Sequence, residues 1–350
     1  MISNREKAIG KFLKKAGWDS ARRAPVTGDA SARKYERLSG IGARKDERAV
    51  LMDAPSSLGG SDYAAIAKLA DGEMAAFTGI GTALTQRGFS APKILAADIE
   101  QGLLLLEDLG DNLVAVAVAD NPASEAKIYG AAVDCLAAIY RSEFSRTLDG
   151  FGHSWPLRAY DAPAMAAEID LMAQWYLPHK SGGKFAGFDD KQAAQWGEIW
   201  QALFARLDKH APGLVLRDFH AENIFWLPER QAISRIGLID FQDGLLGHPA
   251  YDLVSLIEDA RRDVDPALTK KLIARFCLAA KIKNNADFKA AYAIMGAQRN
   301  AKILGIFVRL AKRDKKPDYL DMLPRVEAHF AGNLKHPVMA DLRQFIEGLI

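Results

Sequence analysis

Cysteine is scarce in this chain. Only Cys135 and Cys277 occur among 350 residues, far apart and in no C-x-x-C pair. Small secreted proteins that are held together by disulfides carry many more cysteines, so a disulfide framework is excluded. This scarcity is typical of a protein that works in a reducing compartment, and we expect a cytoplasmic location.

The chain also lacks long apolar runs and a strong charge of one sign. No stretch approaches the roughly 20 apolar residues of a membrane span, and the N-terminal "MISNREKAIGKFLKKAGW" has no apolar core like that of a signal peptide. The 46 basic and 44 acidic side chains leave a net charge of +2. A balanced charge is not typical of nucleic-acid binding. We therefore expect neither a membrane nor a nucleic acid as a partner, and the oligomeric state stays open.

What the sequence does contain is a β-rich part followed by an α-rich part. Residues 20–107 predict five strands and one helix at about 61–87, and "LLLL" at 103–106 is typical of a buried strand. Helical spacing follows at 122–142, 161–177, 190–210, 266–280 and 285–312. The predicted fold class is α+β with two lobes, an N-lobe at 1–107 and a C-lobe at 108–350. A cleft between two lobes is a common ligand site.

A group of polar residues lies between two strand-like runs in "LVLRDFHAENIFWL", residues 214–227. Asp218 and Asn223 are five residues apart, and Asp240 ends the next strand-like run. Phosphoryl transfer needs a carboxylate that orients the attacking hydroxyl, together with oxygen ligands for Mg²⁺. The spacing indicates Asp218 as the catalytic base and Asn223 and Asp240 as metal ligands.

These motifs resemble the aminoglycoside phosphotransferase/choline kinase family, which carries H-G-D-x-H-x-x-N, then I-D-F, then D-L. The positions of this chain that match the family pattern are Asp218, His220, Asn223, Asp240 and Asp252. The resemblance implies a protein-kinase-like fold, ATP and Mg²⁺ as cofactors, and structural roles for His220 and Asp252. Leu216 and Arg217 replace the usual His-Gly, so drug resistance is not the closest match.

The longer pattern, from "TGDASARKYERL" through "LLLLEDLGD" to "QRNAKILGIFVRLAKRDKKPDYL", resembles the bacterial anomeric sugar kinases of cell-wall recycling. That likeness implies transfer of phosphate to the C1 hydroxyl of N-acetylmuramate or N-acetylglucosamine. Two alternatives remain open. In the first, the acceptor is another amino alcohol or sugar, such as an aminoglycoside, choline, homoserine or fructosamine. In the second, the protein is a catalytically silent nucleotide-binding relative.

The nucleotide site is expected around the first turn and the joint between the lobes. In the family context, Gly28 and Ser31 indicate a phosphate loop, and the backbone near Glu107 and Leu109 is expected to receive the adenine. Kinases carry a lysine on the third strand, but Met52 stands there. Strand alternation sends the two replacement candidates, Arg33 and Lys34, to opposite faces, and we favour Arg33. Glu73, the candidate helix glutamate, is interpreted as a solvated charge.

The acceptor residues are less sharply indicated. In a helix expected at 285–312, the apolar stripe comprises Ile303, Ile306, Phe307 and Leu310. The sequence predicts that Arg299 and Lys302 lie on another face, where they are candidates for binding an acceptor carboxylate. Glu168 and Trp175 are seven residues apart and are expected to share a helix face, as further substrate candidates.

Overall fold

The N-terminal part of the chain folds as one antiparallel sheet. The structure is a computed structural model that describes residues 3–26, 33–40, 46–55, 62–70 and 73–349. The sheet has the strand order β1-β2-β3-β5-β4. Its members are β1 (Arg22–Val26), β2 (Lys34–Ser39), β3 (Arg48–Asp53), β4 (Ile94–Asp98) and β5 (Leu103–Glu107). The expected five-stranded sheet is confirmed.

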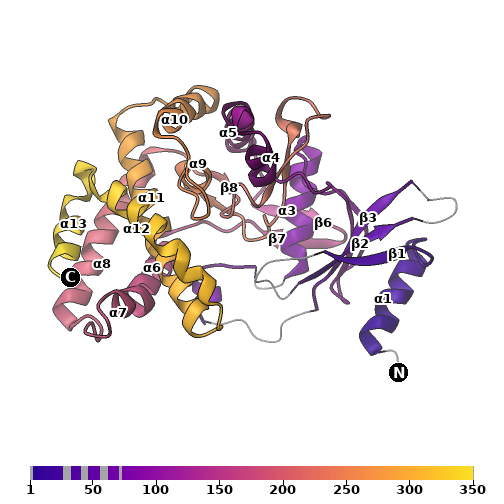
Figure 1. Cartoon of the computed structure of the whole chain (residues 1–350), viewed down its shortest axis with the longest axis horizontal. Coiled ribbons are helices and arrows are strands. Elements are labelled where there is room, and N and C mark those ends of the chain that lie inside the picture. Colours follow the sequence, from indigo (N-terminus) through magenta and orange to yellow (C-terminus); the bar gives the residue numbers. More distant parts are fainter. Residues whose placement is uncertain (1–2, 27–32, 41–45, 56–61, 71–72, 350) are drawn as a thin grey trace.

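Strand β5 is apolar throughout because both of its faces are covered. Leu103 and Leu105 pack with Phe12 of helix α1 (Asn4–Lys15) on one side of the sheet. Leu104 and Leu106 belong to the main core on the other side. Alternate residues of a strand point to opposite faces, so a continuous leucine run fills both layers. Figure 1 shows α1 and α3 on opposite sides of this sheet.

The single helix expected at 61–87 is two helices. The chain forms α2 (Asp62–Ile66), breaks, and forms α3 (Met74–Gln86). At the break, Lys68 has φ 57°, in the left-handed region that ends a helix. The carbonyl oxygen of Ala67 accepts a hydrogen bond from Arg217, and the amide of Ala70 donates to Asp243, so contacts from the C-lobe fix the interruption.

Helix α3 also packs unusually closely on a hairpin of the C-lobe. This hairpin consists of β6 (Thr147–Gly150) and β7 (His153–Pro156). A Cβ atom added to Gly79 would lie 2.8 Å from the carbonyl oxygen of Leu148, and one added to Gly150 would lie 2.5 Å from that of Thr78. Both glycines are therefore required for the helix and the hairpin to touch backbone to backbone.

The C-lobe is mainly helical, as the spacing predicts. Its helices are α4 (Val114–Asp120), α5 (Glu125–Arg141), α6 (Ala162–Leu171), α7 (Leu177–Lys180), α8 (Asp190–Phe204), α9 (Ala250–Ile257), α10 (Pro266–Ala280), α11 (Ala286–Lys312), α12 (Leu323–Leu334) and α13 (Ala340–Glu347). The 27-residue α11 runs through the centre of the lobe, and most of its residues are buried. In Figure 1 the sheet and the helical lobe lie at opposite ends of the molecule. The α+β, two-lobed kinase-like fold is confirmed.

The helix expected at 161–177 is interrupted. Helix α6 ends at Leu171, and residues Met172–Tyr176 form a π-helical turn before α7. None of the helices within the described ranges combines the length and the apolar character that a bilayer span requires.

Candidate active site

The stretch around Asp218 forms a loop between short strands. β8 (Gly213–Val215) pairs with β11 (Leu245–Gly247), and β9 (Ile224–Trp226) pairs with β10 (Ile236–Leu238). Asp252, on α9, accepts hydrogen bonds from the backbone amides of Leu216 (2.6 Å) and Arg217 (2.9 Å). A buried carboxylate thus holds the backbone immediately before Asp218.

The three residues with predicted chemical roles meet at one cleft. The side-chain nitrogen of Asn223 lies 3.1 Å from the carbonyl oxygen of Asp218 and 3.4 Å from Oδ2 of Asp240. Gln242, which stands where kinases have glycine after Asp-Phe, donates to Oδ1 of Asp240 at 2.8 Å. The cleft has a volume of about 800 Å³, and Asp218, Asn223 and Asp240 all line it.

The charges around Asp218 favour its ionised form. Burial raises the pKa of the Asp218 carboxyl, but the positive charges of Lys302 and Arg217 outweigh this effect and leave the pKa below its ordinary value. Burial lowers the pKa of the neighbouring His220 to about 4, so its imidazole is neutral at physiological pH. Asp218 can therefore accept a proton, whereas His220 is better suited to a structural role.

The side chains of Asn223 and Asp240 are suited to bind a magnesium ion whose remaining ligands would be phosphate oxygens and water. Burial and the nearby charge of Asp218 raise the pKa of Asp240, which a bound cation would reverse. The carboxylate is surrounded by protein groups within the cleft, and 43% of its side-chain surface opens into the cleft. Within the described ranges no three His, Cys, Asp or Glu side chains cluster as a metal cage. Mg²⁺ commonly uses one or two protein oxygens together with substrate phosphates, so this sparse donor set suits it.

Residues of the N-lobe close the other side of the cleft. Arg33 is 15% exposed, lines the cleft and lies 3.5 Å from Asp240, whereas Lys34 is exposed and does not line the cleft. Met52 is completely buried in the core and cannot contact a ligand. Gly28 and Ser31, the expected phosphate-loop residues, lie outside the described residues. Arg33 rather than Lys34 therefore faces the cleft, as strand alternation predicts.

Removing the side chain of Arg33 should weaken nucleotide binding. We expect Arg33→Ala to raise the Michaelis constant for ATP about tenfold or more and to lower turnover, because a charge-assisted contact contributes roughly 1.5–3 kcal/mol. Lys34→Ala is the matched control and should change little. Steady-state kinetics with varied ATP checks both variants. A larger defect in Lys34→Ala would show that the cation on the other face holds the phosphates.

The segment that joins the lobes also borders the cleft. Leu109 is buried and lines it, as does Glu107, whose carboxylate pairs with Arg230 at 2.8 Å. The amide of Glu107 donates to the carbonyl oxygen of Lys93, so that group is not available to an adenine. Arg37 is a cleft residue that no sequence motif marks. It lines the cleft and bridges Asp108 and Asp111, each at 2.8 Å.

Helix α11 forms part of the wall of the cleft. Its lining residues are Arg299, Lys302, Ile303, Ile306 and Phe307. The expectation that charged and apolar residues occupy separate faces of this helix is wrong. Residues three, four and seven apart share a helix face. The side chains of Arg299, Lys302, Ile303 and Ile306 therefore all face the cleft. This part of the cleft therefore combines two cations with apolar side chains.

The other two substrate candidates do not line the cleft. Glu168 is completely buried and pairs with Arg217 and Lys302, the latter at 3.4 Å. Trp175 lies in the π-helical turn and packs, partly buried, against the core. The expected common face presumes a regular α-helix from 161 to 177. A π-turn adds residues per turn and rotates all later side chains.

Comparisons with known proteins agree with this geometry. A family model described as the phosphotransferase enzyme family matches residues 22–290. An N-acetylmuramate/N-acetylglucosamine kinase of Caulobacter vibrioides is 37% identical, with 99% of this chain and 97% of that protein aligned. A protein of the same name from Pseudomonas putida is 30% identical, with 93% and 87% aligned.

A solved structure supports the same fold at lower identity. The choline/ethanolamine kinase family protein from Mesorhizobium loti superimposes with a TM-score of 0.58 and 14% identity, covering 96% of each chain. With the matched segment, the cleft and the two sequence relatives in agreement, the chain belongs to the phosphotransferase enzyme family.

Proposed function

We propose that this protein transfers the γ-phosphate of ATP to the anomeric hydroxyl of an N-acetylated amino sugar, N-acetylmuramate or N-acetylglucosamine. The observation that carries the proposal is a single cleft that is lined by two kinds of groups. Asp218, Asn223 and Asp240 supply oxygen atoms, and Arg299 and Lys302 supply positive charges. Relatives named for these two sugars align with nearly the whole chain, which supports the acceptor class.

In the proposed reaction, Asp218 orients the C1 hydroxyl and accepts its proton. An anomeric hydroxyl is more acidic than other sugar hydroxyls, so a carboxylate of low pKa suffices as the base. Asn223 and Asp240 would hold Mg²⁺, which would neutralise charge on the nucleotide phosphates. Arg33, with Gly28 and Ser31, would receive the phosphates, and the carbonyl of Glu107 with the amide of Leu109 would receive the adenine.

An acceptor panel tests this proposal. Incubation with γ-labelled ATP should label N-acetylmuramate and N-acetylglucosamine but not choline, homoserine, a fructosamine or an aminoglycoside. The positive charges of Arg299 and Lys302 in the cleft argue against a polycationic drug, because like charges repel. The methyl glycoside of N-acetylglucosamine, which lacks a free anomeric hydroxyl, is the matched control and should remain unlabelled. Labelling of that glycoside, or of another acceptor alone, would refute the proposal.

Arg299 is the better candidate for recognising the lactyl carboxylate of N-acetylmuramate. Lys302 already binds Tyr251 (3.1 Å) and Glu168, whereas Arg299 donates a long hydrogen bond, 3.4 Å, to the carbonyl oxygen of Glu258. We expect Arg299→Gln to raise the Michaelis constant for N-acetylmuramate about tenfold or more, from loss of a charged hydrogen bond. N-acetylglucosamine has no such carboxylate, so its constant should change much less. Equal changes for both sugars would contradict this role.

A further inference from the structure

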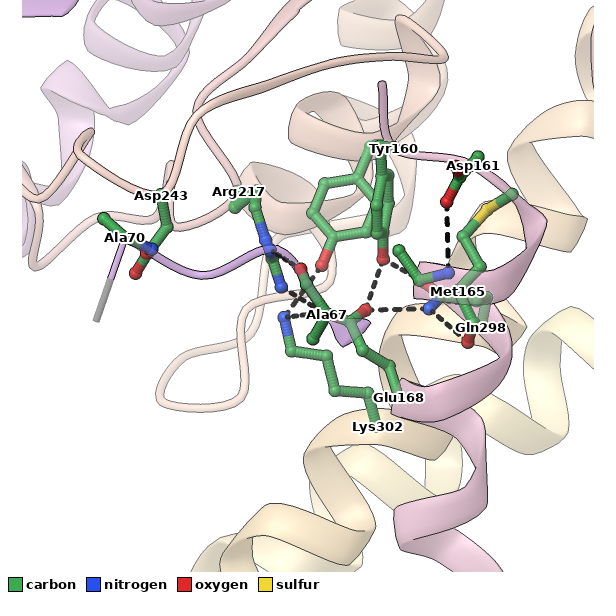
Figure 2. Close-up of polar contacts among 12 residues, drawn as sticks. Ala67, Ala70, Tyr160, Asp161, Met165, Glu168, Arg217, Asp243, Gln298 and Lys302 are labelled. Carbon is green, nitrogen blue, oxygen red and sulfur yellow. Dashed lines mark hydrogen bonds and ion pairs between the residues drawn. The ribbon is translucent and has the colours of Figure 1, made fainter. Parts of the chain in front are cut away.

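A buried polar cluster surrounds the side chain of Arg217, the residue directly before Asp218. The Arg217 guanidinium pairs with the carboxylate of Glu168 and donates to the carbonyl oxygen of Ala67 at 3.0 Å (Figure 2). Its carbon Cζ lies 5.3 Å from the ring centre of Tyr160. Arg217 is 1% exposed and Glu168 is fully buried. Neither can touch a substrate directly.

The backbone of Arg217 has an unfavourable conformation. Its φ of 74° lies in the left-handed region, where any residue other than glycine costs roughly 1–2 kcal/mol. The family pattern has glycine at this position. An arginine there carries a backbone cost that glycine would avoid, and its side chain makes contacts that glycine cannot make.

The carbonyl group that accepts the hydrogen bond from Arg217 belongs to the N-lobe. Ala67 lies at the break between α2 and α3, and this break makes further contacts with the C-lobe. The ammonium of Lys68 donates to the carbonyl oxygen of Ala159 at 2.9 Å, and the amide of Ala70 donates to Asp243 at 2.6 Å. Asp243 follows Asp240 in the proposed metal loop. The 67–70 segment thus joins the start of α3 to both active-site loops.

Most kinases connect these parts in another way. A strand lysine pairs with a glutamate of the equivalent helix, and this ion pair aligns the nucleotide site with the catalytic loop. Here Met52 occupies the lysine position inside the core, and Glu73 is an exposed residue at the N-cap of α3. A thioether cannot form an ion pair, so other contacts align α3. The β6–β7 hairpin packs along the helix, and the 67–70 segment connects the chain before it to the loop of Asp218.

We infer that Arg217 is a positioning residue that fixes Asp218 relative to helix α3 through the carbonyl of Ala67, with Glu168 holding its guanidinium in place. The inference rests on the proposed function for the role of Asp218. A planar guanidinium can satisfy a carboxylate and a carbonyl in two directions at once, which a lysine ammonium does less well.

Glu168 acts through Arg217 rather than on the substrate. Its second carboxylate oxygen accepts hydrogen bonds from the hydroxyl of Tyr160 and from the side chain of Gln298, the latter at 2.9 Å. These bonds leave one oxygen for Arg217 and Lys302. Breaking the buried pair of Glu168 and Arg217 would leave an uncompensated charge, which is costly. The Glu168 carboxylate therefore fixes the position of the Arg217 guanidinium.

Arg217→Gly tests the side chain of this residue separately from its backbone conformation. Glycine tolerates the left-handed backbone, so the substitution removes only the side chain. We expect kcat to fall about 10²-fold with both Michaelis constants within a few-fold of wild type, as for a displaced catalytic group. Added methylguanidinium should restore part of kcat. It should have no effect on the wild-type enzyme or on Arg5→Ala. Arg5 forms a comparable connection, from Asp53 to the carbonyl of Gln101 at 2.6 Å, on the far side of the sheet.

Hydrogen exchange tests the connection between the lobes without any acceptor. The amides of 67–70 all have acceptors in the structure, and they should exchange faster in Arg217→Gly but not in Arg5→Ala. This readout does not depend on the identity of the sugar. A wild-type enzyme that labels no amino sugar would refute the proposed function, whereas unchanged exchange at 67–70 would refute the positioning role.

A second variant keeps the inference testable if Arg217→Gly does not fold. Arg217→Lys retains the charge next to Glu168 but loses the fork, and it should lower kcat about tenfold and also speed exchange at 67–70. A folded variant of either kind with kcat within about three-fold of wild type and with protected 67–70 amides would overturn the inference. So would a loss of kcat in Arg217→Gly that methylguanidinium fails to restore.

Discussion

Asp218→Asn should lower kcat by about 10² or more while leaving the fold and ATP binding intact. Asparagine preserves the shape of the side chain but cannot accept a proton at neutral pH. The loop itself should remain in place, because Asp252 holds the amides of Leu216 and Arg217, and Asp218 contributes nothing to those bonds. The expected loss therefore reports chemistry rather than folding.

Single-turnover measurements with saturating ATP and sugar would check this result. Asp263→Asn is a suitable control, since Asp263 is a 77% exposed carboxylate that pairs with Arg325 at the surface. It should retain wild-type turnover. An Asp218→Asn enzyme that works within a few-fold of wild type would remove Asp218 from the base role, and the general-base mechanism would fail with it.

Asp240→Asn should produce a comparable loss with a different signature. Replacing a charged ligand by a neutral one weakens magnesium binding, so we expect kcat to fall about 10²-fold and half-saturation to need about tenfold more Mg²⁺. Asn223 would remain as a single weak ligand beside the phosphates. The neighbouring Gln242, which donates to Asp240, would also lose a charged acceptor.

Titration of activity with Mg²⁺ at fixed ATP separates this defect from that of Asp218→Asn, whose magnesium requirement should be unchanged. The Asp263→Asn control should have the wild-type requirement. If Asp240→Asn keeps both its turnover and its magnesium dependence, Asp240 is not a metal ligand. In that case the arrangement of Asn223 and Asp240 would need another explanation.

The parts of the fold that follow from local patterns could be predicted from the sequence. A leucine run at 103–106 indicates a strand covered on both faces, and the positions of α1 and α3 satisfy it. The spacing of Asp218, Asn223 and Asp240 brings them together because short strands fix the ends of both loops. Strand alternation is equally local, and it directs Arg33 rather than Lys34 towards the cleft.

What depends on distant contacts could not be predicted. The break at 67–70 is fixed by Arg217 and Asp243, about 150 positions or more along the chain. The π-turn at Met172–Tyr176 separates Glu168 from Trp175, and no local pattern marks it. Arg37 reads as an ordinary strand charge until Asp108 and Asp111 are seen beside it. One signal was present, since an arginine in place of the family glycine at 217 marked a departure that the cluster around it explains.

The close contact between α3 and the β6–β7 hairpin bears on how the activity of this enzyme can be controlled. Many protein kinases are switched off by swinging the equivalent helix away from the active site. Here Gly79 and Gly150 bring backbone against backbone, so an outward swing would open a gap along the whole hairpin and expose core residues such as Leu148 and Trp155. An outward swing of α3 would therefore be costly. We expect the activity of this enzyme not to depend on such a movement.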